Sequence, residues 1–209
     1  EMWFLPAFLD YYRGIGVRQF VILDDGSVDG TREHLLAQPD VVVLASEYSF
    51  GAPARVSHVP VLGSLLPFLG KTIRAGRAYK ELIPQRYFKG KYALYADADE
   101  FLFLPPGLSS LAQVIDRLKA VDADCIAASL VEFFPASLPE LDETAPPESF
   151  EELLRRYSFF EKRRLLTLQA GQQPIKAGNS KSSELFKTYL PDDGIERRSP
   201  ILKTPIARH

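Results

Sequence analysis

The feature that most constrains the fold is an apolar run that ends in acidic residues and is followed by a helix and a second apolar run. Val17–Leu23 has the pattern of a buried strand, and Asp24–Thr31 is an acidic loop that contains glycine. We expect Thr31–Gln38 to continue as a helix and Asp40–Ala45 to form the next buried strand. Continuous apolar strands joined by a helix are typical of parallel sheets. The sequence therefore predicts an α/β fold with a mostly parallel sheet.

The alternation of helix and strand patterns continues along the chain. Further strands are expected at Tyr92–Ala96, Phe101–Leu104 and Cys125–Val131, and helices at Met2–Arg13, Lys71–Leu82 and Leu108–Val121. Between them, Ser46–Gly70 is rich in Gly, Pro and Ser and is expected to form a long surface loop. A loop of this length in a compact domain is more often functional than idle.

The pattern changes after Phe134. We expect a Pro- and acid-rich loop at Pro135–Pro147, a charged helix at Phe150–Leu168, and short strands at Ser183–Tyr189 and Ile201–Ile206. The predicted organisation is therefore a core over residues 1–134 and a C-terminal extension of the same domain over residues 135–209.

Composition narrows the range of partners. The 209 residues are 46% apolar and 25% charged, which is ordinary for a globular protein, and the net charge of −2 argues against a general nucleic-acid-binding surface. No apolar run reaches the ~20 residues that a membrane-spanning helix needs, and no signal peptide is visible. The single cysteine, Cys125, suits a reducing compartment, so we expect a cytoplasmic location. Because the chain begins at Glu1 without Met and stops at His209, we expect it to be a piece of a longer protein.

The strongest chemical signal is the acidic pair Asp97 and Asp99, which follows the predicted strand Tyr92–Ala96. Residues two apart in a strand point to the same side, and the carboxyl edge of an open α/β sheet is where ligands bind. Two neighbouring carboxylates repel each other unless a cation compensates, and Mg²⁺ and Mn²⁺ prefer carboxylate and phosphate oxygens. The alternative interpretation is an ordinary acidic turn after a strand.

The loop Asp24–Thr31 is the second signal. Gly26 and Gly30 allow tight backbone conformations, and a carboxylate at the end of a strand can accept hydrogen bonds from a nucleobase or a ribose. The alternative is that Ser27 or Asp29 simply caps the following helix.

Together, these two loops resemble family 2 glycosyltransferases with the GT-A fold. The resemblance is to a bacterial subgroup whose turn runs Asp-Asn/Asp-Gly-Ser-x-Asp-Gly-Thr and whose metal motif reads Asp-x-Asp-Glu-Phe, matched here by Asp24–Thr31 and Asp97–Phe101. Glu1, Phe4–Leu9 and Gly14–Val17 match the Asn-Glu pair, the Leu-Pro-x-Phe-Leu helix and the Gly-Val turn of that subgroup. The resemblance implies a Rossmann-like, mostly parallel sheet with helices on both faces, and places residues 135–209 on the acceptor side.

The match covers about residues 1–105, half of the chain. The first sheet strand of the subgroup and the Asn that precedes Glu1 are absent from this sequence, and that strand normally builds part of the nucleotide site. A Trp-containing acceptor motif that is common in family 2 synthases is not evident after Phe134.

The resemblance also implies roles for individual residues. Asp97 and Asp99 would hold Mn²⁺ or Mg²⁺, which would bind the diphosphate of a nucleoside diphosphate sugar, with UDP-sugars as the expected donors, and would assist departure of the nucleoside diphosphate. Asp24, and with slightly less weight Asp25, would contact the uracil and ribose. The donor-binding residues that we expect are Glu1, Asp24, Asp25, Ser27, Arg74, Arg77 and Asp97.

Reaction in this family is inverting and needs a general base to deprotonate the acceptor hydroxyl. Glu132 is our candidate because it follows the strand Cys125–Val131, and Glu100 is a candidate for contacting the sugar. Both could instead be ordinary acids. Arg74 and Arg77 lie three apart on the expected helix, where they share a face that could reach the diphosphate or simply be solvated. His209 could be a further metal ligand, as a late His is in some relatives.

The expected acceptor is a glycan or a lipid-linked glycan, in cell-surface polysaccharide assembly. The basic run Arg155–Arg164 is compatible with contact to a membrane surface, although a solvated helical face is the simpler reading. Two alternatives remain open: a catalytically inactive carbohydrate- or nucleotide-binding module, and a phosphatase-type hydrolase that uses the Asp-x-Asp pair. In the phosphatases that pair sits on the first strand, whereas two strands precede it here. The oligomeric state is not predicted.

Overall fold

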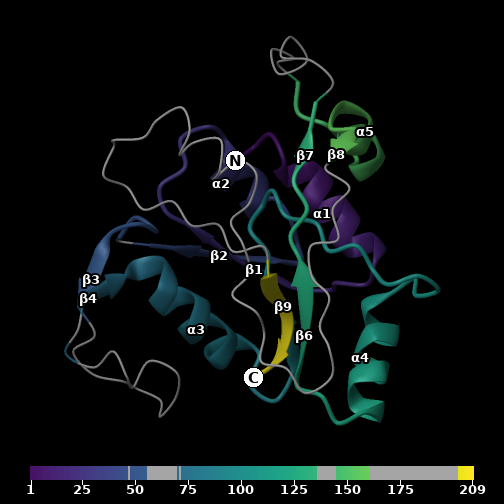
Figure 1. The fold of residues 1–209 in the computed structure, drawn as a ribbon. Helices are drawn as coiled ribbons and strands as arrows, with labels where there is room; N and C mark the ends of the chain where they lie inside the picture. Colours follow the sequence, from purple (N-terminus) through teal and green to yellow (C-terminus); the bar gives the residue numbers. More distant parts are fainter. Residues whose placement is uncertain (47, 56–69, 71, 136–144, 161–201) are drawn as a thin grey trace, which may run out of the picture.

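Residues 20–45 form the strand–helix–strand unit that the sequence predicts. The structure, a computed structural model, describes residues 1–46, 48–55, 70, 72–135, 145–160 and 202–209. Strand β1 (Phe20–Asp24) pairs in parallel with β2 (Val41–Ala45), with Phe20 opposite Val41, and α2 (Thr31–Leu36) connects the two strands (Figure 1). The parallel pairing brings the chain to the same edge of this sheet after each strand, and Asp24 lies at that edge.

Helix α1 (Leu5–Gly14) packs on this unit through its apolar face. A proline in its first turn suits the start of a helix, because the missing N–H would have no partner there. One core cluster joins α1 to β1 and α2 and contains Leu5, Phe8, Leu9, Tyr12, Phe20 and Leu35. At the end of α1, the Arg13 guanidinium donates to both carboxylate oxygens of Asp40, at 2.6 and 2.8 Å, and ties the helix to the start of β2.

A second sheet carries the Asp-x-Asp motif. It has the order β5–β9–β6, formed by β5 (Tyr92–Leu94), β9 (Leu202–Arg208) and β6 (Cys125–Ser129). Both neighbours run antiparallel to β9, so β5 and β6 run in the same direction as each other. Helix α4 (Leu111–Ala120), capped by Ser110, covers this sheet through Leu111, Val114 and Leu118, which pack with Ile206. The backbone N–H of Leu111 donates to Ile15 O at 2.9 Å and connects α4 to the end of α1.

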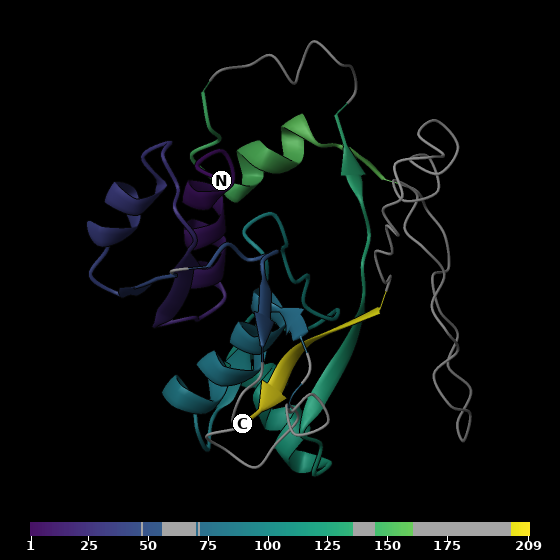
Figure 2. The ribbon, with the colours of Figure 1, turned by 90° about the vertical axis from the view of Figure 1, so that its left-hand side faces the viewer.

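Two short antiparallel pairs complete the described strands. Strand β3 (Pro53–Arg55) pairs with β4 (Thr72–Arg74), which leads directly into α3 (Ala75–Tyr87). Strand β7 (Phe133–Phe134) pairs with β8 (Phe159–Phe160), and between them in sequence lies α5 (Phe150–Arg156), which packs beside α1 (Figure 2).

The predicted mixture of helices and strands is confirmed, but a mostly parallel sheet with helices on both faces is not. The described sheets are small, and β1–β2 is their parallel pair, whereas the other pairings are antiparallel. The reason lies in β9, which inserts between β5 and β6 in the opposite direction. The short strand expected at Ile201–Ile206 is therefore a central one, observed as Leu202–Arg208.

Several element boundaries differ from the expectation. The predicted strand Phe101–Leu104 is not a strand. The backbone C=O and N–H of Leu102 form hydrogen bonds with the hydroxyls of Tyr11 and Tyr12 of α1 instead of with a neighbouring strand. Helix α3 starts at Ala75 rather than Lys71 and passes through Pro84 to Tyr87, so its expected end before Pro84 was wrong. Helix α5 ends at Arg156, where β8 follows instead of further helix. The expected strand Ser183–Tyr189 and most of the loop Ser46–Gly70 lie outside the described residues.

Candidate functional site

Carboxylates from separate parts of the sequence meet beside the ends of β1 and β5. Glu1 precedes α1, Asp25 follows β1, and Asp97 and Asp99 follow β5; we call these residues the acidic site. Partial burial raises the pKa of the Glu1 carboxyl, the amino group of Glu1 opposes that rise, and the charges of Asp99, Asp97 and Asp25 raise the pKa further. The charges of Asp25, Asp97 and Asp99 therefore all act on the Glu1 carboxylate, and the role of these residues as ligands stays a prediction.

Asp97 has a defined set of neighbours. The Tyr95 hydroxyl donates to Asp97 Oδ1 at 2.6 Å, and the Lys80 ammonium lies 4.0 Å from the same oxygen. Burial raises the pKa of Tyr95, and its hydrogen bond to Asp97 raises the pKa further because an ionised phenol would face a carboxylate. Tyr95 is therefore a neutral donor, which orients Asp97 through this hydrogen bond.

The segment after the Asp-x-Asp pair is anchored to α1. The buried Tyr12 hydroxyl donates to Glu100 O at 2.9 Å and accepts from Leu102 N at 3.1 Å, while the Tyr11 hydroxyl donates to Leu102 O at 2.6 Å. The Phe101 ring packs among the aromatic rings of the same helix. This fixes the backbone directly behind Asp97 and Asp99. Tyr12 and Tyr95 were not expected in the site; Tyr95 could have been found because it lies two residues before Asp97 in the strand pattern.

Glu100 turns back toward the motif. Its carboxylate accepts a long hydrogen bond of 3.5 Å from Asp97 N, and its own N–H donates to Asp97 O at 2.9 Å. These bonds form a tight turn that holds Glu100 beside the acidic site. Its assignment as a sugar-contacting residue stays a prediction.

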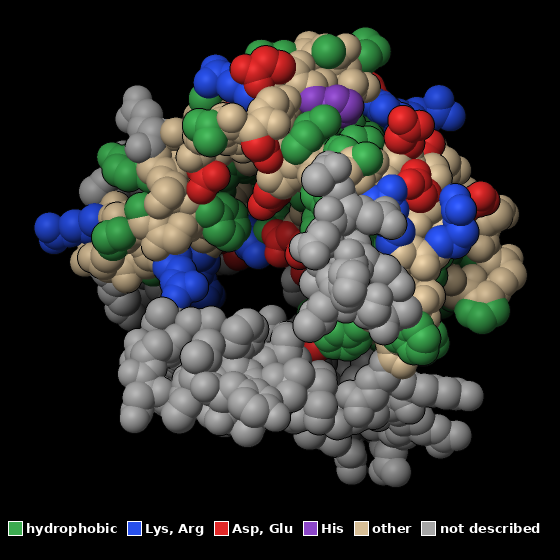
Figure 3. Space-filling view, turned by 90° about the horizontal axis from the view of Figure 1, so that it is seen from above, with side chains coloured by type: hydrophobic (Ala, Val, Ile, Leu, Met, Phe, Trp, Pro, Cys, Tyr) green, Lys and Arg blue, Asp and Glu red, His purple; other side chains and the backbone are tan. Residues whose placement is uncertain are grey.

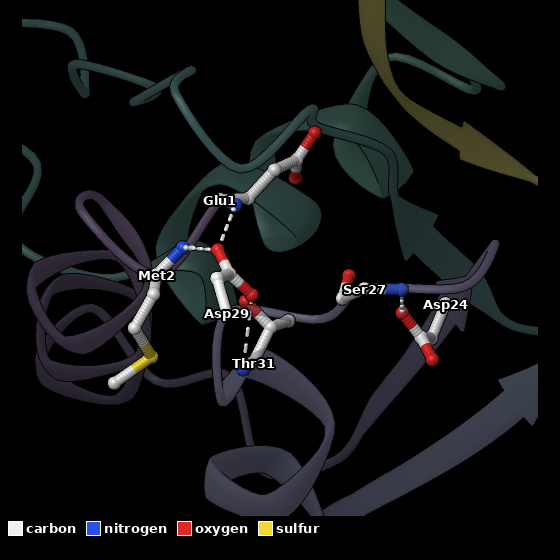
Figure 4. A network of polar contacts seen from close by, with 6 residues as sticks. All are labelled: Glu1, Met2, Asp24, Ser27, Asp29 and Thr31. Atoms are coloured by element: carbon white, nitrogen blue, oxygen red, sulfur yellow. Dashed lines mark hydrogen bonds and ion pairs between the residues drawn. The ribbon is translucent and has the colours of Figure 1, made fainter.

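Asp24 and Asp25 play different structural parts. Asp24 is 5% exposed, and its carboxylate accepts a hydrogen bond from Ser27 N at 3.0 Å (Figure 4). Hydrogen bonds from Ser27 hold the pKa of Asp24 below its usual range, against the effect of burial. Asp25 is exposed. We expected Asp24 to be the stronger nucleotide ligand, but burial and the loop bonds make Asp25 the more accessible of the two carboxylates.

Asp29, which the sequence suggested only as a cap, joins this loop to the start of the chain. Its Oδ2 accepts from the Glu1 and Met2 backbone nitrogens at 2.8 and 3.2 Å, and its Oδ1 accepts from Thr31 N at 3.1 Å. The bonds from the Glu1 amino group and Thr31 lower the pKa of Asp29 strongly. Figure 4 shows the Glu1 side chain pointing away from Asp29, so the backbone is held while the carboxylate projects elsewhere.

The loop after β1 also contacts α3. Asp25 Oδ2 accepts from Phe50 N at 2.8 Å, and the Phe50 ring packs against Gly76 in the first turn of α3, where any Cβ would lie 2.5 Å from the ring. Lys80, one turn further along α3, lies over the Phe50 ring at 5.5 Å and the Tyr95 ring at 4.4 Å. Lys80 belongs to the helix whose basic side chains were expected to reach the diphosphate, but it was not singled out from the sequence, although it follows Arg77 at helical spacing.

The predicted basic pair Arg74 and Arg77 is arranged differently from the expectation. Arg74 ends β4 with an extended backbone and is the N-cap of α3, so it does not share a helix face with Arg77. The helix-spaced pair is instead Arg77 and Lys80. Both arginines are exposed.

Three further candidates are placed by the sheet. Glu132 follows β6, which runs in the direction of β5, so it leaves the sheet from the edge that carries Asp97; its role as the base stays a prediction. His209 N donates to Lys91 O at 3.0 Å, which puts His209 at the opposite end of β5 from Asp97 and separates it from the metal candidates. Of the basic run Arg155–Arg164, Arg155 and Arg156 lie at the end of α5, where Arg156 donates to Ala145 O at 2.7 Å and lies over the Trp3 ring at 5.3 Å. The rest of the basic side chains of this run lie outside the described residues.

The acidic site fits a metal only together with a further ligand. Within the described ranges, no group of three or more His, Cys, Asp or Glu side chains is arranged to hold a metal ion. Mg²⁺ is ordinarily held by one or two carboxylates and by substrate phosphates, and Asp97 and Asp99 supply oxygen ligands of that kind. Figure 3 shows acidic side chains gathered around a hollow of the surface, with basic side chains near its edge (Figure 3).

Comparison with protein-family models, curated protein sequences and solved structures finds no match for this chain. In the part of the chain that the structure describes, no helix combines the length and the apolar character needed to cross a membrane.

Proposed function

We propose that this chain is the donor-binding part of a metal-dependent, inverting glycosyltransferase with a GT-A-type fold. The observation that carries the proposal is the convergence of Glu1, Asp25, Asp97 and Asp99 beside the ends of β1 and β5. Neighbouring carboxylates favour a site that takes a cation, because a cation offsets their mutual repulsion. A cation held there would have its remaining positions open to a diphosphate.

The residues divide the work as follows. Asp97 and Asp99 would hold Mg²⁺ or Mn²⁺, with Tyr95 orienting Asp97 through its hydrogen bond. When bound, the cation would supply charge neutralisation to the departing nucleoside diphosphate. The exposed Asp25 would bind the nucleoside by accepting from ribose or base N–H and O–H groups, while Asp24 holds the loop that presents it. Glu132 would deprotonate the acceptor hydroxyl.

The proposed donor is a nucleoside diphosphate sugar, with UDP-sugars as the first candidates, and the acceptor is a glycan or lipid-linked hydroxyl in cell-surface glycan synthesis. Both rest on the sequence resemblance at Asp24–Thr31 and Asp97–Phe101. A cytoplasmic location at or near a membrane belongs to the same proposal.

A screen of nucleoside diphosphate sugars with and without Mn²⁺ tests the proposal, read out as melting temperature and as slow release of UDP. Ligand at ~100 times its Kd stabilises the folded state by about 2.7 kcal/mol, or roughly 5 to 10 °C for a chain of this size. We expect a shift of that order and UDP release, both dependent on Mn²⁺. Binding without release would favour an inactive binding module, and cleavage of a generic phosphomonoester without UDP-sugar binding would favour a phosphatase.

A further inference from the structure

Lys80 lies against the metal motif although it is distant from it in sequence. Its Nζ is 4.0 Å from Asp97 Oδ1, 4.4 Å from the centre of the Tyr95 ring and 5.5 Å from the centre of the Phe50 ring. Aromatic faces at these distances attract an ammonium group and favour its position there. The Lys80 side chain is still 40% exposed, so the ammonium is guided to the acidic site without being enclosed by it.

The rings that guide Lys80 are themselves fixed by the two loops of the site. Phe50 is held by its N–H bond to Asp25 and by its packing on Gly76, and Tyr95 is held by its bond to Asp97. Lys80 therefore points to the place between the loop after β1 and the loop after β5. That place is where a nucleotide bound to both loops would put its diphosphate.

The carboxylates around Lys80 would repel an incoming diphosphate. A divalent cation would offset the charges of Asp97 and Asp99, but an incoming diphosphate would still meet the carboxylates of Glu1 and Asp25 nearby. A lysine ammonium is a compact charge with several donors and is well suited to phosphate oxygens. We propose that Lys80 binds the diphosphate of the donor, exchanging its contact with Asp97 for the phosphate oxygens when metal and nucleotide bind.

This inference rests on the proposed function and adds a residue to it. It also separates Lys80 from Arg77, three residues earlier on α3, and from Arg74, which lies before the helix begins. The ammonium of Lys80 lies 4.0 Å from Asp97 Oδ1, a carboxylate of the Asp-x-Asp pair. Among the basic residues of α3, replacement of Lys80 should therefore weaken the binding of ligands that carry phosphates more than the binding of ligands without them.

The test is calorimetric titration of UDP, and separately of uridine, into the chain in the presence of Mn²⁺. The proteins compared are the unaltered chain, Lys80→Gln, Lys80→Arg and the control Lys119→Gln, which removes the same charge from an exposed position on α4. We expect Lys80→Gln to weaken UDP binding about tenfold, as for loss of one charge-assisted hydrogen bond, and to leave uridine binding within about twofold. Lys80→Arg should retain most of the UDP affinity, and Lys119→Gln all of it.

Two kinds of failure can be told apart. If the unaltered chain does not bind UDP with Mn²⁺, the proposed function is overturned and the role of Lys80 with it. If the unaltered chain binds UDP and Lys80→Gln binds it equally well, or loses UDP and uridine affinity to the same extent, only the diphosphate role of Lys80 is overturned. Melting temperatures of all variants show whether the fold is retained.

Discussion

Neighbouring carboxylates in this molecule have separate tasks that their burial and hydrogen bonds decide. Asp24 is buried and its carboxylate accepts a hydrogen bond from Ser27 N, so its charge stabilises the conformation of the loop. Asp25, the next residue, is exposed and contributes its charge to the acidic site. Asp29 and Glu1 show the same contrast. The Asp29 carboxylate binds the backbone nitrogens before α1, whereas the Glu1 carboxylate points away from Asp29.

Asp24→Ala should lower the free energy of unfolding by about 2 kcal/mol at pH 7, because it leaves the part-buried N–H of Ser27 without its charged acceptor. The folded state lowers the pKa of Asp24, so this stabilisation is present above the unfolded-state pKa of about 4 and is lost as the pH falls through the folded-state value. Urea unfolding at a series of pH values should show the variant and the unaltered chain converging below about pH 4. A difference that stays constant with pH would contradict this assignment.

Asp25→Ala is the matched comparison. Its carboxylate is exposed, so we expect a change in unfolding free energy of about 0.5 kcal/mol or less, together with a several-fold loss of UDP affinity. Calorimetry and thermal unfolding of the same sample separate the two effects. If Asp25→Ala lowers the free energy of unfolding but keeps its affinity for UDP, Asp24 and not Asp25 would be the nucleotide-binding carboxylate.

At the scale of elements, α1 is the support on which the site is assembled. It packs on β1 and α2, its tyrosines hold the backbone after Asp99, and the chain before it supplies Glu1. Helix α3 performs the corresponding task on the other side, with Gly76 accommodating Phe50 and Lys80 facing Asp97. Each loop of the site is thus fixed by a helix that is not its neighbour in sequence.

Tyr12→Phe should destabilise the chain by about 2 kcal/mol, because the Glu100 carbonyl and the Leu102 N–H lose their partner in a buried setting. We also expect weaker Mn²⁺-dependent UDP binding, since the backbone behind Asp97 and Asp99 is released. Denaturant unfolding and calorimetry measure the two effects. Unchanged stability would show that these hydrogen bonds do not anchor the motif.

Gly76→Ala should displace Phe50, because the added Cβ would lie 2.5 Å from its ring. The displacement breaks the hydrogen bond from Phe50 N to Asp25 and the contact of the Phe50 ring with Lys80, so UDP affinity should fall. Gly14→Ala is the control, since a Cβ there meets nothing within 4 Å. The idea fails if both variants bind UDP as the unaltered chain does.

At the scale of the whole molecule, the sequence was most informative where patterns are local. The run Val17–Leu23 with its loop and helix led correctly to β1, α2 and the parallel partner β2, and the acids after Tyr92–Ala96 led to the acidic site. The position of β9 could not be predicted, because nothing local in Leu202–Arg208 specifies that it inserts between β5 and β6. Neither Lys80 nor Tyr12 was singled out, for the same reason: their positions come from contacts between segments distant in sequence.

The position of β9 makes a prediction about the stability of the second sheet. Ile206, 2% exposed, packs against Leu111, Val114 and Leu118 of α4. Ile206→Ala should therefore lower the free energy of unfolding by about 3 kcal/mol through lost burial and the cavity left behind. Denaturant unfolding provides the measurement; a loss of less than about 1 kcal/mol would show that β9 is not a central strand of the core.

The central claim is that Asp97 and Asp99 hold a divalent cation that binds together with a nucleoside diphosphate. The most direct measurement is calorimetric titration of UDP into the unaltered chain and into Asp99→Ala, each with and without Mn²⁺, with circular dichroism to confirm that the fold is kept. The account predicts Mn²⁺-dependent UDP binding by the unaltered chain and its loss in Asp99→Ala with the fold intact. Equal UDP affinity in the two proteins, or affinity that does not depend on Mn²⁺, would contradict it.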